Sequence, residues 1–370
     1  MVSMEPETAH ATMLTLARES RGMTQLDVAK AMSALAGERI SQGYVSKAES
    51  GRLKVSGARL ELYGRALRYP PGTLCVDADV HGVGIGLVHH RKKAALGAQA
   101  LRRIHAELAL TRLQVRGLVP SVTEDVHHFE RVAVTDLESP SDAARTLRKL
   151  WNLPEGPVSD LVQTIEQAGG LVLIRDLGTR DVDAVSQWNG VEAPLFLLNA
   201  HAPGDRFRFS LGHELGHIVM HPEPGATTLQ ERQADEFASE FLMPAADIAA
   251  DLRNGLDLNR LLALKHRWGV SMAALVRRAV TLAAISDWQY RNLMVEMSTL
   301  GYRTHEPGDL ARERPDKVTT IVERLTHAQG LDRVAVTAGL LPEEFRRLYL
   351  SDAAQDGDSP DADTVHEVHR

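Results

Sequence analysis

Two histidines and a glutamate in the segment RFSLGHELGHIVMH have the spacing of a metal-binding helix. His213 and His217 are four residues apart, so on an α-helix their side chains lie one turn apart on the same face and can bind one ion. Glu214 follows the first histidine, as in the H-E-x-x-H pattern, where two imidazoles bind zinc and the glutamate acts as general base on the metal-bound water. The spacing therefore predicts a zinc-dependent hydrolytic site.

Two helices are needed to position these groups. Leu211, Leu215 and Ile218 give the first helix an apolar side that can pack inward. A catalytic zinc ion takes three protein ligands and leaves one position open, so the third ligand is sought in the next segment, TTLQERQADEFASEFLMP. An apolar stripe at helical spacing runs along this segment, formed by Ala234, Phe237, Ala238, Phe241 and Leu242.

Several residues compete for the remaining metal-binding role. Glu231 and Asp235 form an E-x-x-x-D pair that resembles thermolysin-like peptidases, in which the Glu binds zinc and the later acid orients a ligand histidine. The resemblance implies Glu231 as the third ligand and Asp235 as the group that holds the outer N–H of one imidazole. Glu236 and Glu240 are competitors that we expect on the solvent side. His221 is either a fourth ligand or, as we favour, a histidine near the negative end of its helix.

The paired motifs also closely resemble the ImmA/IrrE family of bacterial zinc metallopeptidases, over roughly residues 160–285. The matching stretches are Arg208-Phe209, Gly212 to His217, His221-Pro222 and Glu231 to Pro244. The resemblance implies a gluzincin-like domain that binds Zn²⁺ and acts as a site-specific endopeptidase. Its implied substrate is a helix-turn-helix repressor or another regulator built on that scaffold.

Three short strands are predicted immediately before the metal helix, in the runs GLVLIRD, DAVSQWN and APLFLLN. An edge strand beside such a site can hold an extended peptide by backbone pairing. The pattern fits a protein substrate, and it leaves open which strand forms the edge.

A second group of polar residues lies on a short helix near the N-terminus. Ser41 is expected to cap this helix, which carries Gln42, Tyr44 and Lys47. Gln can read adenine in the major groove, and Lys can hold bases or phosphates. These residue types are suited to a DNA-recognition helix.

The string TQLDVAKAM…SQGYVSKAESG resembles the XRE (lambda-repressor-like) helix-turn-helix family. The resemblance implies that Gln25 contacts a phosphate and that Glu49 is structural. The residues expected on the DNA side of the recognition helix are Ser41, Gln42, Gly43, Tyr44 and Lys47. The connection SALAGERI between the two helices is several residues longer than the usual tight turn, which changes the expected docking angle.

Charge is unevenly distributed along the 370 residues, whose net charge is −7. Residues 1–120 hold 17 Lys and Arg against 10 Asp and Glu, whereas the remainder holds 25 against 39. A basic first third indicates that double-stranded DNA would meet the N-terminal part. With Cys75 as the single cysteine, neither an intrachain disulfide nor a Cys-rich zinc site can form. Since no signal peptide or membrane-length apolar run is present, we expect a cytoplasmic protein without a membrane partner.

The expected fold class is α+β and mostly α, with a lambda-repressor-like domain, a metallopeptidase domain with a small three-stranded sheet, and a helical C-terminal region. The expected boundaries are 8–72 for the helix-turn-helix, 73–140 for a connecting hairpin and long helix, 141–300 for the peptidase, 301–350 for the C-terminal helices and 351–370 for a disordered acidic tail. Heptad-like apolar positions in the long helix fit either a bridge between domains or a homodimer.

The sequence thus predicts a DNA-binding transcriptional regulator that carries a zinc endopeptidase and cleaves a protein partner, in particular a helix-turn-helix repressor. The alternative is a non-proteolytic regulator, or a component of a toxin–antitoxin or phage-related pair. In that case the peptidase fold would sense a metal or another ligand.

Overall fold

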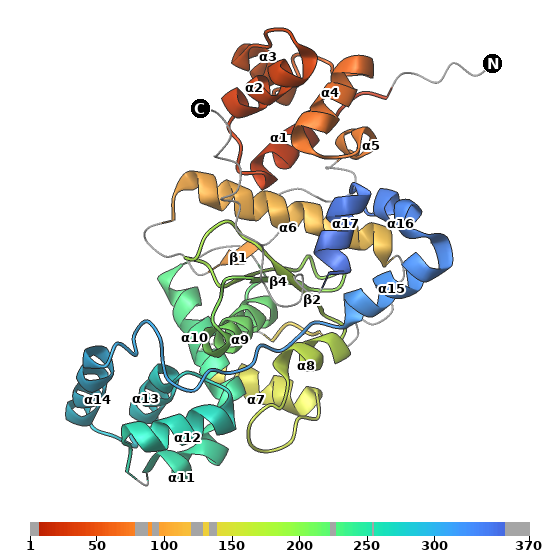
Figure 1. Cartoon of the computed structure of the whole chain (residues 1–370). Helices are drawn as coiled ribbons and strands as arrows, with labels where there is room; N and C mark the ends of the chain where they lie inside the picture. Colours follow the sequence, from red (N-terminus) through yellow and green to blue (C-terminus); the bar gives the residue numbers. More distant parts are fainter. Residues whose placement is uncertain are drawn as a thin grey trace.

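The computed structural model describes residues 7–77, 88–90, 96–119, 129–132, 139–222, 227–253 and 255–351. These residues form a mostly helical molecule around one small sheet (Figure 1). The helices are α1 (Ala11–Ser20), α2 (Gln25–Ala36), α3 (Gln42–Glu49), α4 (Gly57–Leu67), α5 (Pro71–Leu74), α6 (Ala98–Leu118), α7 (Pro140–Leu150), α8 (Leu161–Gln167), α9 (Gly204–Met220), α10 (Thr228–Leu242), α11 (Ala245–Arg253), α12 (Leu258–Trp268), α13 (Met272–Thr281), α14 (Asp287–Thr299), α15 (Lys317–Gln329), α16 (Leu331–Thr337) and α17 (Pro342–Tyr349). The strands are β1 (Val88–His90), β2 (Leu171–Arg175), β3 (Ala184–Gln187) and β4 (Leu195–Asn199).

The sheet has the strand order β1-β3-β4-β2. Strands β2, β3 and β4 confirm the small sheet predicted before the metal helix, and β1 adds a further strand next to β3. β2 runs parallel to β4, while β3 is antiparallel to β4. β1 is antiparallel to β3, with His89 opposite Ser186. The sequence left open which strand forms the edge of the sheet. In the structure β1 and β2 are the outer strands, and β1 covers the side of β3 that faces away from β4.

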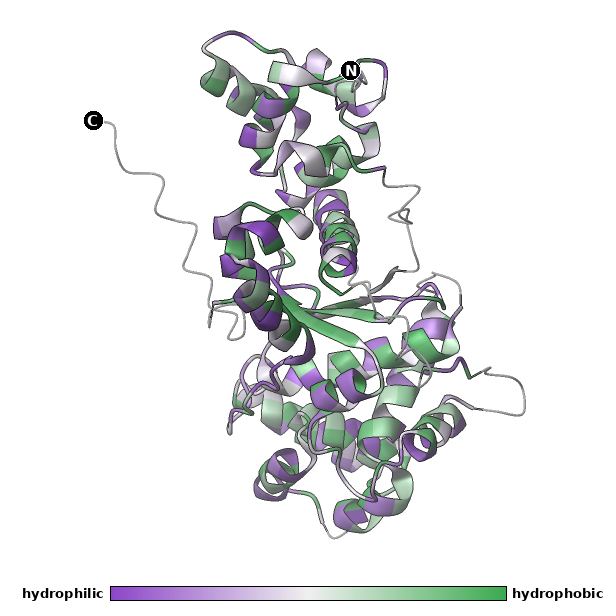
Figure 2. Ribbon diagram, turned by 90° about the vertical axis from the view of Figure 1, so that its right-hand side faces the viewer, coloured by the Kyte–Doolittle hydropathy of each residue, from purple (hydrophilic) through white to green (hydrophobic). Residues whose placement is uncertain are grey.

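Strands β2 and β4 are buried on both faces, which explains why their sequences are continuous apolar runs. Leu171 and Leu173 of β2 face a core shared with α1–α6 and α15–α17. Val172 and Ile174, which alternate with these leucines along the strand, face a second core formed with α7–α14. Figure 2 shows the hydrophobic sheet between these two layers of helices. The alternation of side chains thus makes the sheet the boundary between two cores.

Helices α2 and α3 begin and end at residues of the types that commonly cap helices. Thr24 forms a capping box, since its Oγ1 accepts the N–H of Asp27 and its own N–H donates to the Asp27 carboxylate. Ser41 caps α3 by accepting the N–H of Tyr44 at 3.2 Å. Helix α2 continues to Ala36 and ends at Gly37, whose φ of 69° suits glycine. Half of the stretch expected as a connection is therefore helical, and the prediction of a long loop there was wrong.

Helix α6 lies between the N-terminal helices and the sheet (Figure 1). Its apolar positions Ile104, Leu108 and Val115 are buried within one chain, which favours the bridging interpretation over a dimer seam. Helices α15–α17 pack beside α6, and Glu344 of α17 binds Arg21, the residue that caps the C-terminal end of α1, with oxygen–nitrogen distances of 2.5 and 2.8 Å. The N-terminal helices are thus held by α6 and by the C-terminal helices together.

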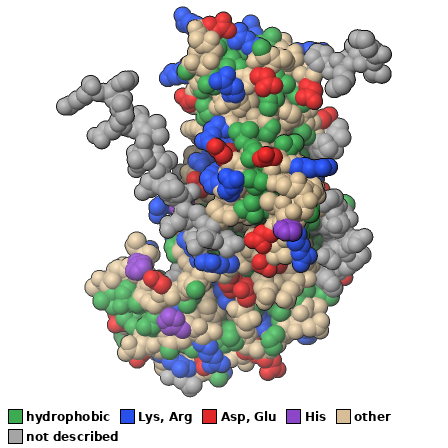
Figure 3. All heavy atoms as spheres, turned by 45° about the vertical axis from the view of Figure 1, so that its right-hand side comes forward, with side chains coloured by type: hydrophobic (Ala, Val, Ile, Leu, Met, Phe, Trp, Pro, Cys, Tyr) green, Lys and Arg blue, Asp and Glu red, His purple; other side chains and the backbone are tan. Residues whose placement is uncertain are grey.

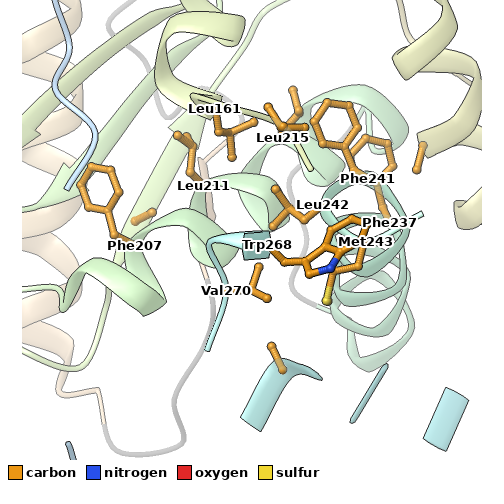
Figure 4. Packing of buried hydrophobic residues seen from close by; sticks show 14 of the residues in the cluster. Leu161, Phe207, Leu211, Leu215, Phe237, Phe241, Leu242, Met243, Trp268 and Val270 are labelled. Atoms are coloured by element: carbon orange, nitrogen blue, oxygen red, sulfur yellow. The ribbon is translucent and has the colours of Figure 1, made fainter. Parts of the chain in front are cut away.

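Helices α9 and α10 pack closely along their length (Figure 4). Leu211 and Leu215 of α9 are buried with Phe237 and Phe241 of α10. A Cβ atom at Gly216 would lie only 3.0 Å from the Phe237 ring, so glycine allows the two helices to approach each other here. Among the described residues, none of the helices combines the length and apolar character that a bilayer crossing requires.

Candidate metal centre

His213, His217 and Glu231 converge where α9 faces α10. Each offers one ligand atom, and these atoms lie within 4.8 Å of one another. The Nε2 atoms of the two histidines are 3.1 Å apart, and the Glu231 carboxylate lies 3.4 Å from His217 Nε2 and 3.6 Å from His213 Nε2. Both imidazoles are almost fully buried. The structure therefore brings together the three residues that the sequence predicted as ligands.

The donor set fits a zinc ion. Two imidazole nitrogens and one carboxylate oxygen are the ligands of a common class of catalytic zinc sites, which keep a fourth position open. Glu231 Oε1 is buried and has no hydrogen-bond partner among the described residues. A buried carboxylate oxygen without a partner is costly, and coordination of a cation would satisfy it.

Asp235 lies next to the outer nitrogen of His213. Its Oδ1 is 2.8 Å from His213 Nδ1, so the imidazole donates its Nδ1–H to the carboxylate. This bond turns Nε2 of the same ring toward His217 and Glu231. Asp235 therefore occupies the position predicted for the residue that orients a ligand histidine.

His217 is oriented by a different partner that the sequence did not predict. Its Nδ1 lies 2.9 Å from Nδ1 of His221, and His221 Nε2 lies 3.0 Å from Oε1 of Gln233. Both contacts are satisfied when His217 donates to His221 and His221 donates to Gln233. His221 thus supports His217 from behind and is outside the group of three candidate ligands.

The protonation of the site follows from these contacts. Burial lowers the pKa of His213, but its interactions with Asp235 and Glu231 outweigh burial and raise the pKa to about 9. Burial lowers the pKa of His217 to about 4. At neutral pH His213 is therefore the charged ring, and its Nε2–H points into the 3.1 Å contact with His217. A metal ion would have to displace this proton.

Glu214 is placed beside the sheet rather than among the ligands. It is 1% exposed, and its Oε2 accepts a hydrogen bond from Ser186 Oγ of β3 at 2.6 Å. Burial raises the pKa of Glu214 to about 8, despite the charge of His213 and the Ser186 hydrogen bond. A carboxyl group with a pKa near the working pH can act as both proton acceptor and donor.

Residues 165–280 match the peptidase family described as the IrrE N-terminal-like domain. Residues 14–74 match the family described as helix-turn-helix. The chain is a fusion of these two domains. No curated protein matches the chain at a meaningful level. The matches support a DNA-binding regulator with a metallopeptidase-type domain, as the sequence indicated.

A cavity of about 430 Å³ opens beside His213 and Glu214 in the IrrE-like domain. Its walls come from the start of α9 and from α13, α14 and the segment after α14. The lining combines apolar side chains with exposed arginines, among them Arg277 and Arg303. The sequence gave no signal for these residues, because they lie far along the chain from the H-E-x-x-H motif and only the fold brings them to the site.

The two competing glutamates of α10 differ in their surroundings. Glu236 is exposed, as expected, and accepts a hydrogen bond from Ser141. Glu240 is 3% exposed and forms ion pairs with Arg278 and Arg145. The prediction that Glu240 faces solvent was wrong, because α13 and α7 cover that side of α10 with arginines.

In the helix-turn-helix domain, most of the predicted DNA contacts lie at one surface. Ser41, Gln42, Gly43 and Lys47 are exposed on or beside α3. On the face that Figure 3 shows, basic and acidic side chains are interspersed over the upper part of the molecule, where the helix-turn-helix domain lies.

Two of the predicted contacts are engaged inside the helix-turn-helix domain. Gln25 is partly buried, accepts from Gln42 Nε2 at 2.7 Å and donates to Glu49 at 2.9 Å. Tyr44 stacks on Tyr63 with ring centroids 6.3 Å apart, so it is half turned toward the domain core. Glu49 also binds Arg18, in keeping with the structural role expected for it.

Proposed function

We propose that this chain is a transcriptional regulator whose IrrE-like domain is a zinc-dependent endopeptidase. The observation that carries the proposal is the convergence of His213, His217 and Glu231 within 4.8 Å. The hydrogen bond from His213 to Asp235 supports it, since such bonds accompany histidine ligands in zinc sites. The helix-turn-helix domain supplies DNA binding, and the proposed substrate is a protein partner, in particular a helix-turn-helix repressor.

His213, His217 and Glu231 would hold the zinc ion, and Glu214 performs the proton transfers. When bound, zinc supplies Lewis-acid polarisation of the scissile carbonyl. Glu214 takes a proton from the attacking water as the new C–O bond forms, and it delivers that proton to the amine as the C–N bond breaks. Ser186 holds Oε2 of Glu214 in place during both transfers.

The test is cleavage of a helix-turn-helix repressor encoded beside this chain, followed by mass spectrometry. Wild type with one equivalent of zinc should make a single cut. Glu214→Gln keeps the size of the side chain and should lower the rate by about 10²–10⁴-fold, the range for general-base loss. Glu236→Gln on the exposed side of α10 is the matched control and should cut normally. Equal cleavage by the Glu214→Gln protein would refute the assignment.

A second candidate function is regulation without cleavage of an external protein. The observation that favours it is the pairing of β1 with β3, which occupies the strand edge beside the metal helix. An extended peptide that binds by strand addition needs a free edge. If β1 stays in place, the IrrE-like domain serves as a metal- or ligand-responsive part of the regulator.

A further inference from the structure

A second cavity lies where three parts of the molecule meet, remote from the metal centre. It has a volume of about 510 Å³. The helix-turn-helix side contributes residues 69–76, the bridging helix contributes residues 110–117, and α16 with its following turn contributes residues 336–339. Small-molecule sites have volumes of roughly 300–1,000 Å³ and are frequent at domain junctions. The size and place of this cavity therefore fit a small ligand.

The lining is largely apolar, with a few polar groups. Val76, Leu110, Leu113 and Val336 are among its apolar residues. Figure 3 turns this side of the molecule toward the viewer, and apolar side chains are visible among the charged ones on its upper half. Val336 is 68% exposed, so it offers apolar surface at the margin of the cavity. A ligand with a substantial apolar body would cover this surface.

Two hydrogen-bond donors in the lining have no partner among the described residues. Gln114 is 5% exposed, and its Oε1 accepts the hydroxyl of Tyr349 at 2.8 Å, which leaves its Nε2 amide group without an acceptor. Arg116 binds Glu192 through Nε and Nη2, and its Nη1 has no such bond. Because Gln114 and Arg116 both line the cavity, an amide N–H and a guanidinium N–H are available there to an oxygen acceptor with negative charge.

We propose that this cavity binds a small apolar carboxylic acid. The apolar body packs on Leu110, Leu113 and Val336, and the carboxylate accepts from Gln114 Nε2 and Arg116 Nη1. Thr73 Oγ1 donates to the carbonyl of Gly339 at 2.9 Å beside the cavity. A ligand there contacts the helix-turn-helix domain and the C-terminal helices at once, so its binding strengthens their docking.

The experiment uses the full chain with decanoate as the probe and 1-decanol as the matched molecule without a carboxylate. Isothermal titration should give one decanoate site per chain, with an affinity at least tenfold higher than that for decanol. Val336→Trp, at an exposed position of the lining, should weaken decanoate binding at least tenfold. Leu150→Trp makes the same kind of change outside the cavity, at a residue 39% exposed, and should bind as wild type.

Gln114→Glu separates the polar contact from the apolar one. The new carboxylate can still accept the Tyr349 hydroxyl, but it removes the amide donor and repels the probe. Decanoate binding should therefore fall at least tenfold, while decanol binding changes little. Decanoate should also slow hydrogen exchange at residues 69–76 and 336–340 in wild type. Absence of decanoate binding, equal binding by Val336→Trp, or equal affinities for the two probes would overturn the proposal.

Discussion

His213 on α9 and Asp235 on α10 are joined by a 2.8 Å contact between Nδ1 and a carboxylate oxygen. This contact links the packing of the two helices to the direction of the His213 ring. Because Nε2 of that ring faces Glu231 and His217, the geometry of the candidate metal centre depends on α9 and α10 keeping their relative position.

Replacing Asp235 should therefore weaken metal binding without unfolding the protein. Asp235→Ala removes the acceptor for the Nδ1–H of His213, and zinc affinity should fall about 10–100-fold, the usual effect of losing such a partner. Competition against a chromogenic zinc chelator measures the change. Glu236→Ala, at the exposed neighbouring position, should leave affinity unchanged. Indistinguishable affinities for the two variants would contradict the orienting role of Asp235.

Zinc binding should depend on pH through His213, whose pKa is raised to about 9 in the metal-free protein. Below pH 9 the ion must displace this proton. The apparent affinity for zinc should therefore fall about tenfold for each unit by which the pH decreases, counting this one group alone. In the metal-free protein the raised pKa stabilises the fold below the ordinary histidine pKa, and this contribution is lost as pH rises through 9. Calorimetric titration of the protein with zinc, in buffers of different ionisation enthalpy, should show that zinc binding releases protons at pH 7.5. Binding that is independent of pH would refute the charged state assigned to His213.

The buried ion pair between Glu240 and Arg278 should matter for stability. Both side chains are nearly inaccessible, and Glu240→Ala would leave Arg278 buried without its partner. Breaking such a pair costs about 3–5 kcal/mol, whereas Glu236→Ala at an exposed site should change stability by about 0.5 kcal/mol or less. Urea unfolding of the two variants gives the comparison. A similar small effect at both positions would mean that Arg278 finds other acceptors.

DNA binding should respond to the exposed residues of α3. Lys47→Ala removes one phosphate contact, so affinity should fall for all sequences and the salt slope should decrease by about one. Gln42→Ala should instead relax preference at one base position, by about 1–3 kcal/mol. Fluorescence anisotropy at several salt concentrations separates the two effects. Lys149→Ala, an exposed lysine on α7, is the control and should bind DNA as wild type.

The pairing of β1 with β3 should limit access of extended peptides. His89 lies opposite Ser186 in this pairing. Proline has no backbone N–H to donate to a neighbouring strand, so His89→Pro should weaken the pairing of β1 with β3. If β1 blocks the edge, repressor cleavage by this variant should be several-fold faster than by wild type. The double variant with Glu214→Gln should not cleave, which assigns the activity to this site. An unchanged rate would mean that substrate binds elsewhere.

The sequence predicted features that depend on residues close together in the chain. The four-residue spacing of His213 and His217, the pair Glu231–Asp235 and the cap at Ser41 are local patterns, and all lie where the helical periodicity places them. Glu240 was misplaced because its burial depends on Arg278, which belongs to another helix.

The parts that the sequence missed depend on long-range packing. His221 supports His217 only because Gln233 of the facing helix accepts the Nε2–H of His221, which leaves His221 Nδ1 as the acceptor for His217. The cavity residue Arg277 reaches the site through the packing of α13, and the β1–β3 pairing joins segments about a hundred residues apart. None of these has a periodic pattern that a single sequence could reveal.

The attachment of α1 to α6, together with the Arg21–Glu344 ion pair, joins the DNA-reading helices to the rest of the molecule by contacts that do not involve the peptide chain between residues 77 and 96. A single cut in that connection would leave two fragments that remain associated. Cleavage at this place would therefore produce a nicked but assembled chain, and release from DNA would need a second event that separates the fragments.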